Sequence, residues 1–336
     1  MKSHKTLIIA EAGVNHNGSL DLAKNLVDVA SQAGADVVKF QTFKAEKLVT
    51  ENATKAAYQM EKTTAKESQF TMLKRLELSF EMHQDILAFC KKKKIRFAST
   101  GFDSSSVDVL IEMGVDFLKV PSGEITNLPY LRHVATKGLP IILSTGMCTM
   151  QEVTSAVEIL KKAGASFHDI TVLHCNSQYP TPMEDVNLRA MLSMKKELGV
   201  KVGYSDHTLG IEVPIAAVAM GAKIIEKHFT LDRDMNGPDH ASSLEPDELK
   251  QMVESIRNIE KAMGDGQKKP SKSEEANIAV VRKSIVAAKN IKAGESFTED
   301  NLAVKRPGTG VSPLLWYELL GKEAMFDYKT NDQIII

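Results

Sequence analysis

Short apolar segments recur along the first 230 residues, and each of them ends in small or polar residues. The eight segments are TLIIAEAG (6–13), DVVKFQT (36–42), IRFASTGF (95–102), DFLKVPSG (116–123), LPIILSTG (139–146), DITVLHCN (169–176), VKVGYSDH (200–207) and AKIIEKHF (222–229). Apolar runs of this length, bounded by turn residues, are typical of buried strands. The pattern therefore predicts eight strands.

Segments with a helical period separate these strands. Ala23, Leu26 and Ala30 fall on one face of a helix, Ser19 can cap its first turn, and Gly34 can end it. Strands that alternate with helices predict βαβ units and a parallel sheet of the α/β class. Eight units predict a (β/α)8 TIM barrel, with a doubly wound open sheet as the alternative. No GxGxxG motif follows the first strand, which disfavours a dinucleotide-binding sheet.

The alternation of strand-like and helical segments ends after residue 230. One more amphipathic helix follows, and then the charged segment DGQKKPSKSEEAN (265–277), whose composition is typical of a linker. Short strand-like runs with turn residues fill the remainder. We therefore expect a barrel domain over 1–263, a linker over 264–281 and a small β-rich domain over 282–336.

Composition narrows the classes of function. Lysine and arginine total 42 against 43 acidic residues, so neither nucleic-acid nor membrane binding is expected. The N-terminal apolar run is too short for a signal peptide, and no apolar stretch approaches a membrane span. The three cysteines, Cys90, Cys148 and Cys175, are widely spaced and odd in number, which disfavours a disulfide framework. These features favour a cytoplasmic protein.

In a TIM barrel, the loops that follow the strands meet at one face, where active sites lie. Each of the eight predicted strands ends with at least one polar side chain. These residues are Glu11, Lys39, Gln41, Thr100, Lys119, Ser122, Glu124, Ser144, His174, His207, Glu226 and His228. The sequence therefore predicts a polar site at this face.

His207 and His228 occupy equivalent positions at the ends of consecutive strands. Two imidazoles placed in this way can bind one divalent cation and leave coordination positions for substrate and water. The alternative is that both are ordinary hydrogen-bonded side chains. The equivalent positions of the pair favour the metal.

Lys39 and Lys119 lie inside apolar strands, where a lysine needs an anionic partner. With Thr100, Ser122 and Ser144 they could bind a phosphate and a carboxylate. Two alternatives remain open, which are ion pairs with glutamates inside the barrel and a Schiff-base lysine of the aldolase type.

Several long motifs resemble the sialic acid synthase (N-acylneuraminate synthase) family. They include IIAEAGVNHNG, VVKFQTF, KVPSGEITNLPYL, GYSDHTLGI and IEKHFTLD, and the tail AAKNIKAGESFTEDNLAVKRPGTG resembles the family's antifreeze-like (SAF) domain. The resemblance implies a transferase that condenses phosphoenolpyruvate with an N-acyl mannosamine-type sugar. The product would be a nine-carbon 2-keto acid, formed with release of phosphate in a metal-dependent reaction.

The resemblance also implies roles for individual residues. His207 and His228 would hold Mn²⁺, or Mg²⁺ or Co²⁺, and Glu124 would be the acid or base. Phosphoenolpyruvate would be bound by Lys39, Thr100, Lys119, Ser122 and Ser144, and the sugar by Glu11, Gln41, Tyr179 and Asp239. Arg306 would reach the sugar from the partner subunit's antifreeze-like domain, in a domain-swapped homodimer.

Some positions depart from the family pattern, among them Phe40, Gly101 and Pro121. Ser177 stands where many members have an asparagine that contacts the phosphate, so that contact is not carried over. GYSDHTLGI and MGDGQKKPSKSE most resemble bacterial N,N′-diacetyllegionaminic acid synthases, which favours 2,4-diacetamido-2,4,6-trideoxymannose as the sugar. The alternative is N-acetylmannosamine, for an N-acetylneuraminate synthase; a lysine-type aldolase and a non-catalytic sugar-binding barrel are weaker alternatives.

Overall fold

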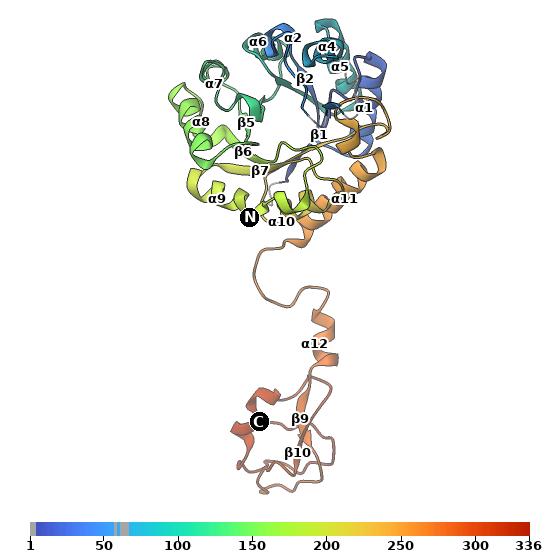
Figure 1. Ribbon diagram of the computed structural model, residues 1–336. Helices are drawn as coiled ribbons and strands as arrows, with labels where there is room; N and C mark the ends of the chain where they lie inside the picture. Colours follow the sequence, from blue (N-terminus) through green and yellow to red (C-terminus); the bar gives the residue numbers. More distant parts are fainter. Residues whose placement is uncertain (1–4, 57–58, 61–66) are drawn as a thin grey trace. The chain divides into compact units, whose positions relative to one another are not determined.

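The computed structural model describes residues 5–56, 59–60 and 67–336. The chain forms two compact units, Met1–Asp265 and Gly266–Ile336 (Figure 1). Each unit has a hydrophobic core of its own. Within the described part of the chain, no helix combines the length and apolar character needed to cross a membrane.

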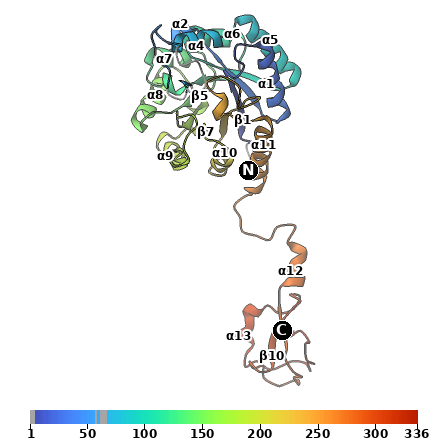
Figure 2. The same cartoon turned by 45° about the vertical axis from the view of Figure 1, so that its right-hand side comes forward.

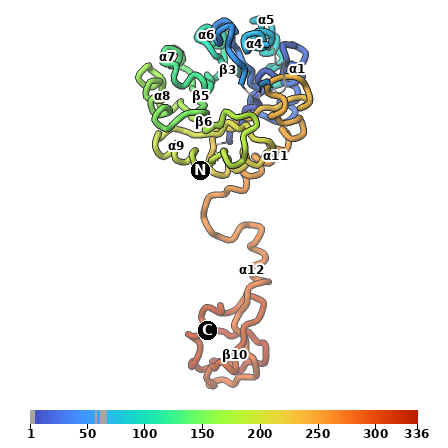
Figure 3. Tube along the Cα trace, in the orientation of Figure 1, coloured from blue at the N-terminus to red at the C-terminus, as the bar shows by residue number. Residues whose placement is uncertain are grey.

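Eight parallel strands close into a barrel in the first unit. In chain order they are β1 (Leu7–Gly13), β2 (Val37–Thr42), β3 (Arg96–Gly101), β4 (Leu118–Val120), β5 (Ile141–Ser144), β6 (Ile170–Cys175), β7 (Lys201–Asp206) and β8 (Ile224–His228). β1 pairs with β2 on one side and with β8 on the other. The colours therefore follow chain order around the ring in Figure 3. This closure confirms the predicted (β/α)8 barrel and excludes the open sheet.

Helices surround the barrel (Figure 2). They are α1 (Leu20–Gln32), α2 (Ala45–Leu48), α4 (Gln69–Leu76), α5 (Phe80–Lys93), α6 (Ser104–Glu112), α7 (Leu128–Ala135), α8 (Met150–Lys162), α9 (Leu188–Leu198), α10 (Glu212–Ala219) and α11 (Pro246–Ala262). Single 3-10 turns lie in the connections, namely η1 (Ser122–Glu124), η2 (Phe167–Asp169), η3 (Met183–Asp185) and η4 (His240–Ser242). The apolar faces of α1 and α5–α11 pack on the outside of the strands and form the main core, whereas those of α2 and α4 belong to a separate cluster.

Helix α1 illustrates how the sequence determines where a helix begins, which face it buries and where it ends. The Ser19 hydroxyl accepts a hydrogen bond from the Leu22 backbone N–H at the first turn. Ala23, Leu26 and Ala30 are buried, as their helical spacing predicts. Gly34, just beyond the helix, has a φ of +79°, a conformation that favours glycine.

The tips of β7 and β8 are joined by a charged pair on the outside of the barrel. Asp206 pairs in register with Lys227, and both side chains are fully buried. The Lys227 ammonium lies 2.5 Å from the Asp206 carboxylate and also donates to the Thr208 carbonyl oxygen at 2.6 Å. Asp206 in turn accepts hydrogen bonds from the Thr208 N–H and hydroxyl. These bonds fix the two strand ends that carry His207 and His228.

The second unit begins with an exposed segment and α12 (Glu275–Val281), so a helix occupies the end of the predicted linker. β9 (Ser284–Ala287) and β10 (Leu302–Lys305) pair antiparallel, followed by η5 (Pro313–Leu315) and α13 (Trp316–Leu319). Ile285, Phe297 and Leu302 lie in its small core. This confirms the predicted small β-rich unit.

We expect Lys227→Met to destabilise the barrel by about 3–5 kcal/mol, because it leaves the Asp206 carboxylate buried without its cation. The exposed Lys223, which directly precedes β8, offers a control, and Lys223→Met should change stability by less than about 0.5 kcal/mol. Urea unfolding is best followed by far-UV circular dichroism, because the single tryptophan, Trp316, lies in the second unit. Equal midpoints for the two variants would show that the buried pair contributes no net stability.

Candidate active site

Side chains inside the barrel form two layers that differ by two residues along each strand. The lower layer is apolar and consists of Ile9, Val37, Ala98, Phe117, Ile142, Leu173 and Ile224. β7 supplies Gly203 at this level, where a Cβ would lie 2.4 Å from the Ile224 carbonyl oxygen. Alternate residues of a strand share one face. The next inward positions are Glu11, Lys39, Thr100, Lys119, Ser144, Cys175, Ser205 and Glu226, all of which line a cavity.

Charges in this upper layer compensate one another. The Lys39 ammonium lies 2.5 Å from Glu11 Oε2 and 3.6 Å from Glu226 Oε2. The Lys119 ammonium lies 3.5 Å from Glu226 Oε1. All four side chains are at most 7% exposed, so each charge depends on these neighbours rather than on water. We call these four residues the charge cluster.

Hydroxyl groups complete the surroundings of the charge cluster. Lys39 donates to Thr100 Oγ1 at 2.6 Å, and Lys119 donates to Ser144 Oγ at 2.7 Å. The Ser205 hydroxyl donates to Glu226 Oε1 at 2.9 Å. Two ammonium groups with hydroxyls beside them, facing a cavity, can bind an anion with several oxygens.

The two carboxyl groups of the charge cluster differ in their titration. Burial raises the pKa of Glu11 to about 7, in spite of the attraction of Lys39. Burial acts in the same direction on Glu226, but the ammonium groups of Lys119 and Lys39 outweigh it and lower its pKa to about 2. Glu226 is therefore ionised at neutral pH, whereas Glu11 can gain or lose a proton there.

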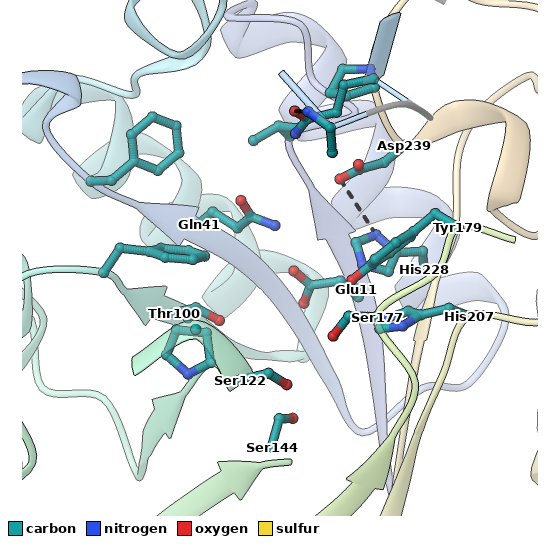
Figure 4. A pocket seen from close by; sticks show the side chains of 18 of the residues that line it. Glu11, Gln41, Thr100, Ser122, Ser144, Ser177, Tyr179, His207, His228 and Asp239 are labelled. Atoms are coloured by element: carbon teal, nitrogen blue, oxygen red, sulfur yellow. Dashed lines mark hydrogen bonds and ion pairs between the residues drawn. The ribbon is translucent and has the colours of Figure 1, made fainter. Parts of the chain in front are cut away.

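Two histidine rings lie at the cavity wall beside the charge cluster (Figure 4). The centroids of His207 and His228 are 5.5 Å apart, and the Tyr179 ring stacks on His207 at 3.9 Å. His207 Nδ1 is 2.5 Å from the Asn176 carbonyl oxygen, which can only accept a hydrogen bond. Nδ1 therefore carries the proton, and Nε2 keeps its lone pair.

Both histidines are in the neutral protonation state that metal binding requires. Burial lowers the pKa of His207 to about 4 and the pKa of His228 well below 6.5, so both rings are neutral at neutral pH. Buried His228 Nδ1 has no hydrogen-bond partner among the described residues and lies 3.8 Å from Asp239 Oδ2. Burial also raises the pKa of Asp239, to about 6.

Within the described residues, no group of three or more histidine, cysteine, aspartate or glutamate side chains is placed to hold a metal ion. The two neutral imidazoles fit a cation that takes its remaining ligands from substrate and water. The residues present therefore fit the expected metal, with Nε2 of His207 and the unpaired buried nitrogen of His228 as donors.

The cavity has a volume of about 420 Å³ and opens at the C-terminal ends of the strands. It brings together most of the residues that the sequence singled out. Those lining it are Glu11, Lys39, Gln41, Thr100, Lys119, Ser122, Ser144, Tyr179, His207, His228 and Asp239. Figure 4 shows Gln41, Thr100, Ser144 and His228 among the side chains that lie around this space.

Two of the expected residues are not among the described residues that line the cavity of the first unit. Glu124 ends η1, and its carboxylate accepts a hydrogen bond from the Asn127 amide at 2.5 Å. Arg306 belongs to the second unit, where it is exposed and its Nε donates to the Val281 carbonyl oxygen at 2.9 Å.

The structure also adds residues to the site. Glu226, which the sequence placed at the polar face of the barrel without a specific role, is the one carboxylate of the charge cluster that contacts both lysines. Cys175 and Ser205 line the cavity at the same level, and Ser177 lines it nearby. The sequence could have indicated Cys175 and Ser205, because each lies two residues after the position that its strand, β6 or β7, contributes to the apolar layer.

Comparison with known proteins identifies the family. The model of the NeuB family matches residues 26–268, most of the barrel unit. The chain belongs to the NeuB family. The SAF domain model matches residues 282–326, within the second unit.

Curated NeuB relatives resemble the chain over nearly its full length. An N,N′-diacetyllegionaminic acid synthase of Campylobacter jejuni is 54% identical over 98% of this chain and 99% of its own. A protein of the same name from Legionella pneumophila is 52% identical over 91% of this chain and 86% of its own. The crystal structure of a Leptospira borgpetersenii N-acetylneuraminic acid synthetase is 36% identical, with a TM-score of 0.71 over 82% of this chain and 91% of that one.

Proposed function

We propose that this NeuB family member is an N,N′-diacetyllegionaminate synthase. It condenses phosphoenolpyruvate with 2,4-diacetamido-2,4,6-trideoxymannose and releases phosphate. The observation that carries this proposal is the 54% identity to the Campylobacter jejuni N,N′-diacetyllegionaminic acid synthase across both chains. The human N-acetylneuraminate-9-phosphate synthase is 36% identical, so the alternative product N-acetylneuraminate has less support. Phosphoenolpyruvate as substrate also agrees with the cytoplasmic location expected from the sequence.

The charge cluster and its hydroxyls are suited to phosphoenolpyruvate. Lys39 and Lys119 would neutralise its phosphate and carboxylate, with hydroxyl donors from Thr100, Ser122 and Ser144. Both lysines also contact Glu226, so the two ammonium groups would be shared between that carboxylate and the arriving anion. The lysines act through their charge in this reaction, and no Schiff base is needed.

His207 and His228 would hold the divalent metal, which we take to be Mn²⁺. At that position a bound metal would supply Lewis-acid polarisation of the aldehyde of the open-chain sugar. Gln41, Tyr179 and Asp239 line the same cavity and would orient the sugar.

The carboxyl groups of Glu226 and Glu11 would act in the steps that follow attack on the aldehyde. Positive charge develops at C2 of phosphoenolpyruvate as its enol carbon forms the new bond, and the ionised Glu226 stabilises that charge. Water adds at C2, and phosphate leaves from the resulting tetrahedral carbon. Glu11 lines the cavity and has a pKa of about 7, which suits it for moving protons at neutral pH. We therefore place this role on Glu11 in preference to Glu124.

The reaction is tested by incubating the protein with Mn²⁺, the diacetamido sugar and phosphoenolpyruvate that carries oxygen-18 in its bridging position. Because water attacks carbon, the C2–O bond breaks, and mass spectrometry should find the label in phosphate. N-acetylmannosamine supplied in a parallel reaction should be the poorer substrate. Label retained in the keto acid would mean attack at phosphorus and would overturn this mechanism.

Metal binding is tested with the paired variants His207→Gln and His174→Gln. His174 also ends a strand but hydrogen-bonds the Val186 carbonyl oxygen at 2.9 Å, so it serves as the control. We expect His207→Gln to weaken Mn²⁺ binding by about 10- to 100-fold, as loss of a ligand or its support does, while His174→Gln binds like the wild type. Electron paramagnetic resonance of free Mn²⁺ measures this without turnover, and EDTA should abolish product formation. Full turnover in excess chelator would remove the metal from the mechanism.

We further propose that Arg306 acts from the partner subunit of a domain-swapped homodimer. The exposed segment before α12 separates the two units in sequence, and a segment of this composition can span between subunits. A guanidinium offers five donors, which suits the amide carbonyl of an N-acyl sugar. Its present partner, a single backbone carbonyl, leaves donors for a substrate.

Arg306→Ala should lower kcat/KM tens- to hundreds-fold, about 2–4 kcal/mol, with Lys305→Ala as the neighbouring control. Mixing Arg306→Ala chains with inactive Lys119→Met chains distinguishes the two arrangements. If the arginine acts between subunits, a mixed dimer has one intact site and activity returns. Heterodimers that form without regaining activity would show that the arginine acts within its own chain.

A further inference from the structure

One side of the cavity is apolar, although the barrel interior around it is charged. Seven apolar side chains form a cluster that is separate from the main core, and every one of them lines the cavity. We call them the apolar wall: Val14, Phe43, Leu48, Met72, Leu73, Leu76 and Phe102. A cluster that served only to pack helices onto the barrel would not need all of its members along the cavity.

The apolar wall is built mainly by the connection between β2 and α5, which contains α2 and α4. These two short helices lie together at one side of the ring of helices in Figures 1 and 2. Met72 and Leu76 are almost fully buried and hold α4 in place. Leu48, Leu73 and Phe102 are only partly buried, so they keep surface that a ligand can cover. The Phe43 and Phe102 rings meet edge to face at 6.0 Å, which stiffens the wall.

The two charged side chains of α4, Lys74 and Arg75, pair with carboxylates outside that helix. Lys74 donates to Glu46 at 2.6 Å, and Arg75 contacts Glu67 at 3.1 Å. None of these four is among the described residues that line the cavity. None of the seven residues of the apolar wall carries a charge, although the side chains of Gln59 and Gln69, from the same connection, also line the cavity.

We infer that the apolar wall binds the C6 methyl group of a 6-deoxy sugar and selects against a hydroxyl at that carbon. This inference rests on the proposed function. The aldehyde end of the sugar must face the histidine pair and the charge cluster, so C6, at the opposite end, reaches away from them. A methyl group gains from burial against apolar side chains, whereas a hydroxyl placed there loses its hydrogen bonds to water.

Two sugars that differ by one oxygen atom test the wall. They are 2-acetamido-2,6-dideoxymannose and N-acetylmannosamine, each supplied with phosphoenolpyruvate and Mn²⁺ to the full-length protein. We expect the wild type to favour the 6-deoxy sugar by about 10- to 100-fold in kcat/KM, the range in which an apolar pocket discriminates against an added hydroxyl. Both sugars lack a substituent amide at C4, so the comparison isolates C6.

Leu73→Gln and Leu48→Gln should bring this preference down to less than about threefold, because the new amides can hydrogen-bond a C6 hydroxyl. Phe70→Gln is the matched control, since Phe70 is a partly buried apolar residue of α4 that is not among the described cavity-lining residues. It should keep the wild-type preference. Both leucines are partly buried, and thermal unfolding verifies that the variants fold.

The outcomes separate the inference from the proposed function. A wild type that converts both sugars with equal kcat/KM, or leucine variants that lose activity toward both sugars equally, would overturn the role of the wall and leave the synthase activity standing. A wild type that forms no keto acid from any N-acyl mannosamine-type sugar would overturn the proposed function itself.

Discussion

Two ammonium groups and two carboxyl groups are buried together inside the barrel, and the geometry of the site depends on how they compensate one another. A buried charge without a partner costs several kcal/mol, so Lys39 and Lys119 are tolerable only where carboxylates reach them. Glu11 comes from β1 and Glu226 from β8, strands that are neighbours only because the sheet closes. Barrel closure and the charge cluster therefore depend on each other.

Alternation along the strands places this cluster at a defined height. The apolar layer below it fills the barrel interior, and the next inward residue on each strand faces the cavity. Side chains that point outward from the ends of the same strands have a structural role. The buried pair of Asp206 and Lys227 holds the ends of β7 and β8 together, and the residue after each of them is a histidine of the candidate metal site. A shift of one residue in either strand would reverse both arrangements.

The cavity combines three environments that suit three parts of a reaction. Charged and hydroxyl side chains on the inner face of the strands suit a small anion, and neutral imidazoles at the ends of β7 and β8 suit a cation. The apolar wall from the β2–α5 connection suits the part of a sugar that does not react. Barrel strands provide the first two environments with fixed geometry, whereas a loop insertion provides the third. This division is how TIM barrels vary specificity while they keep the reaction centre.

The sequence by itself determined the barrel, the small second unit and the polar face of the strands, because periods of two and 3.6 residues follow directly from backbone geometry. The resemblance to the sialic acid synthase family supplied the reaction. Only the tertiary structure decided that Glu124 does not line the cavity. Glu226 lies within β8, where alternation fixes its direction, whereas Glu124 lies beyond the end of β4, in a turn whose path no period predicts. The apolar wall likewise joins residues from 14 to 102, whose meeting depends on how α2 and α4 fold over the barrel.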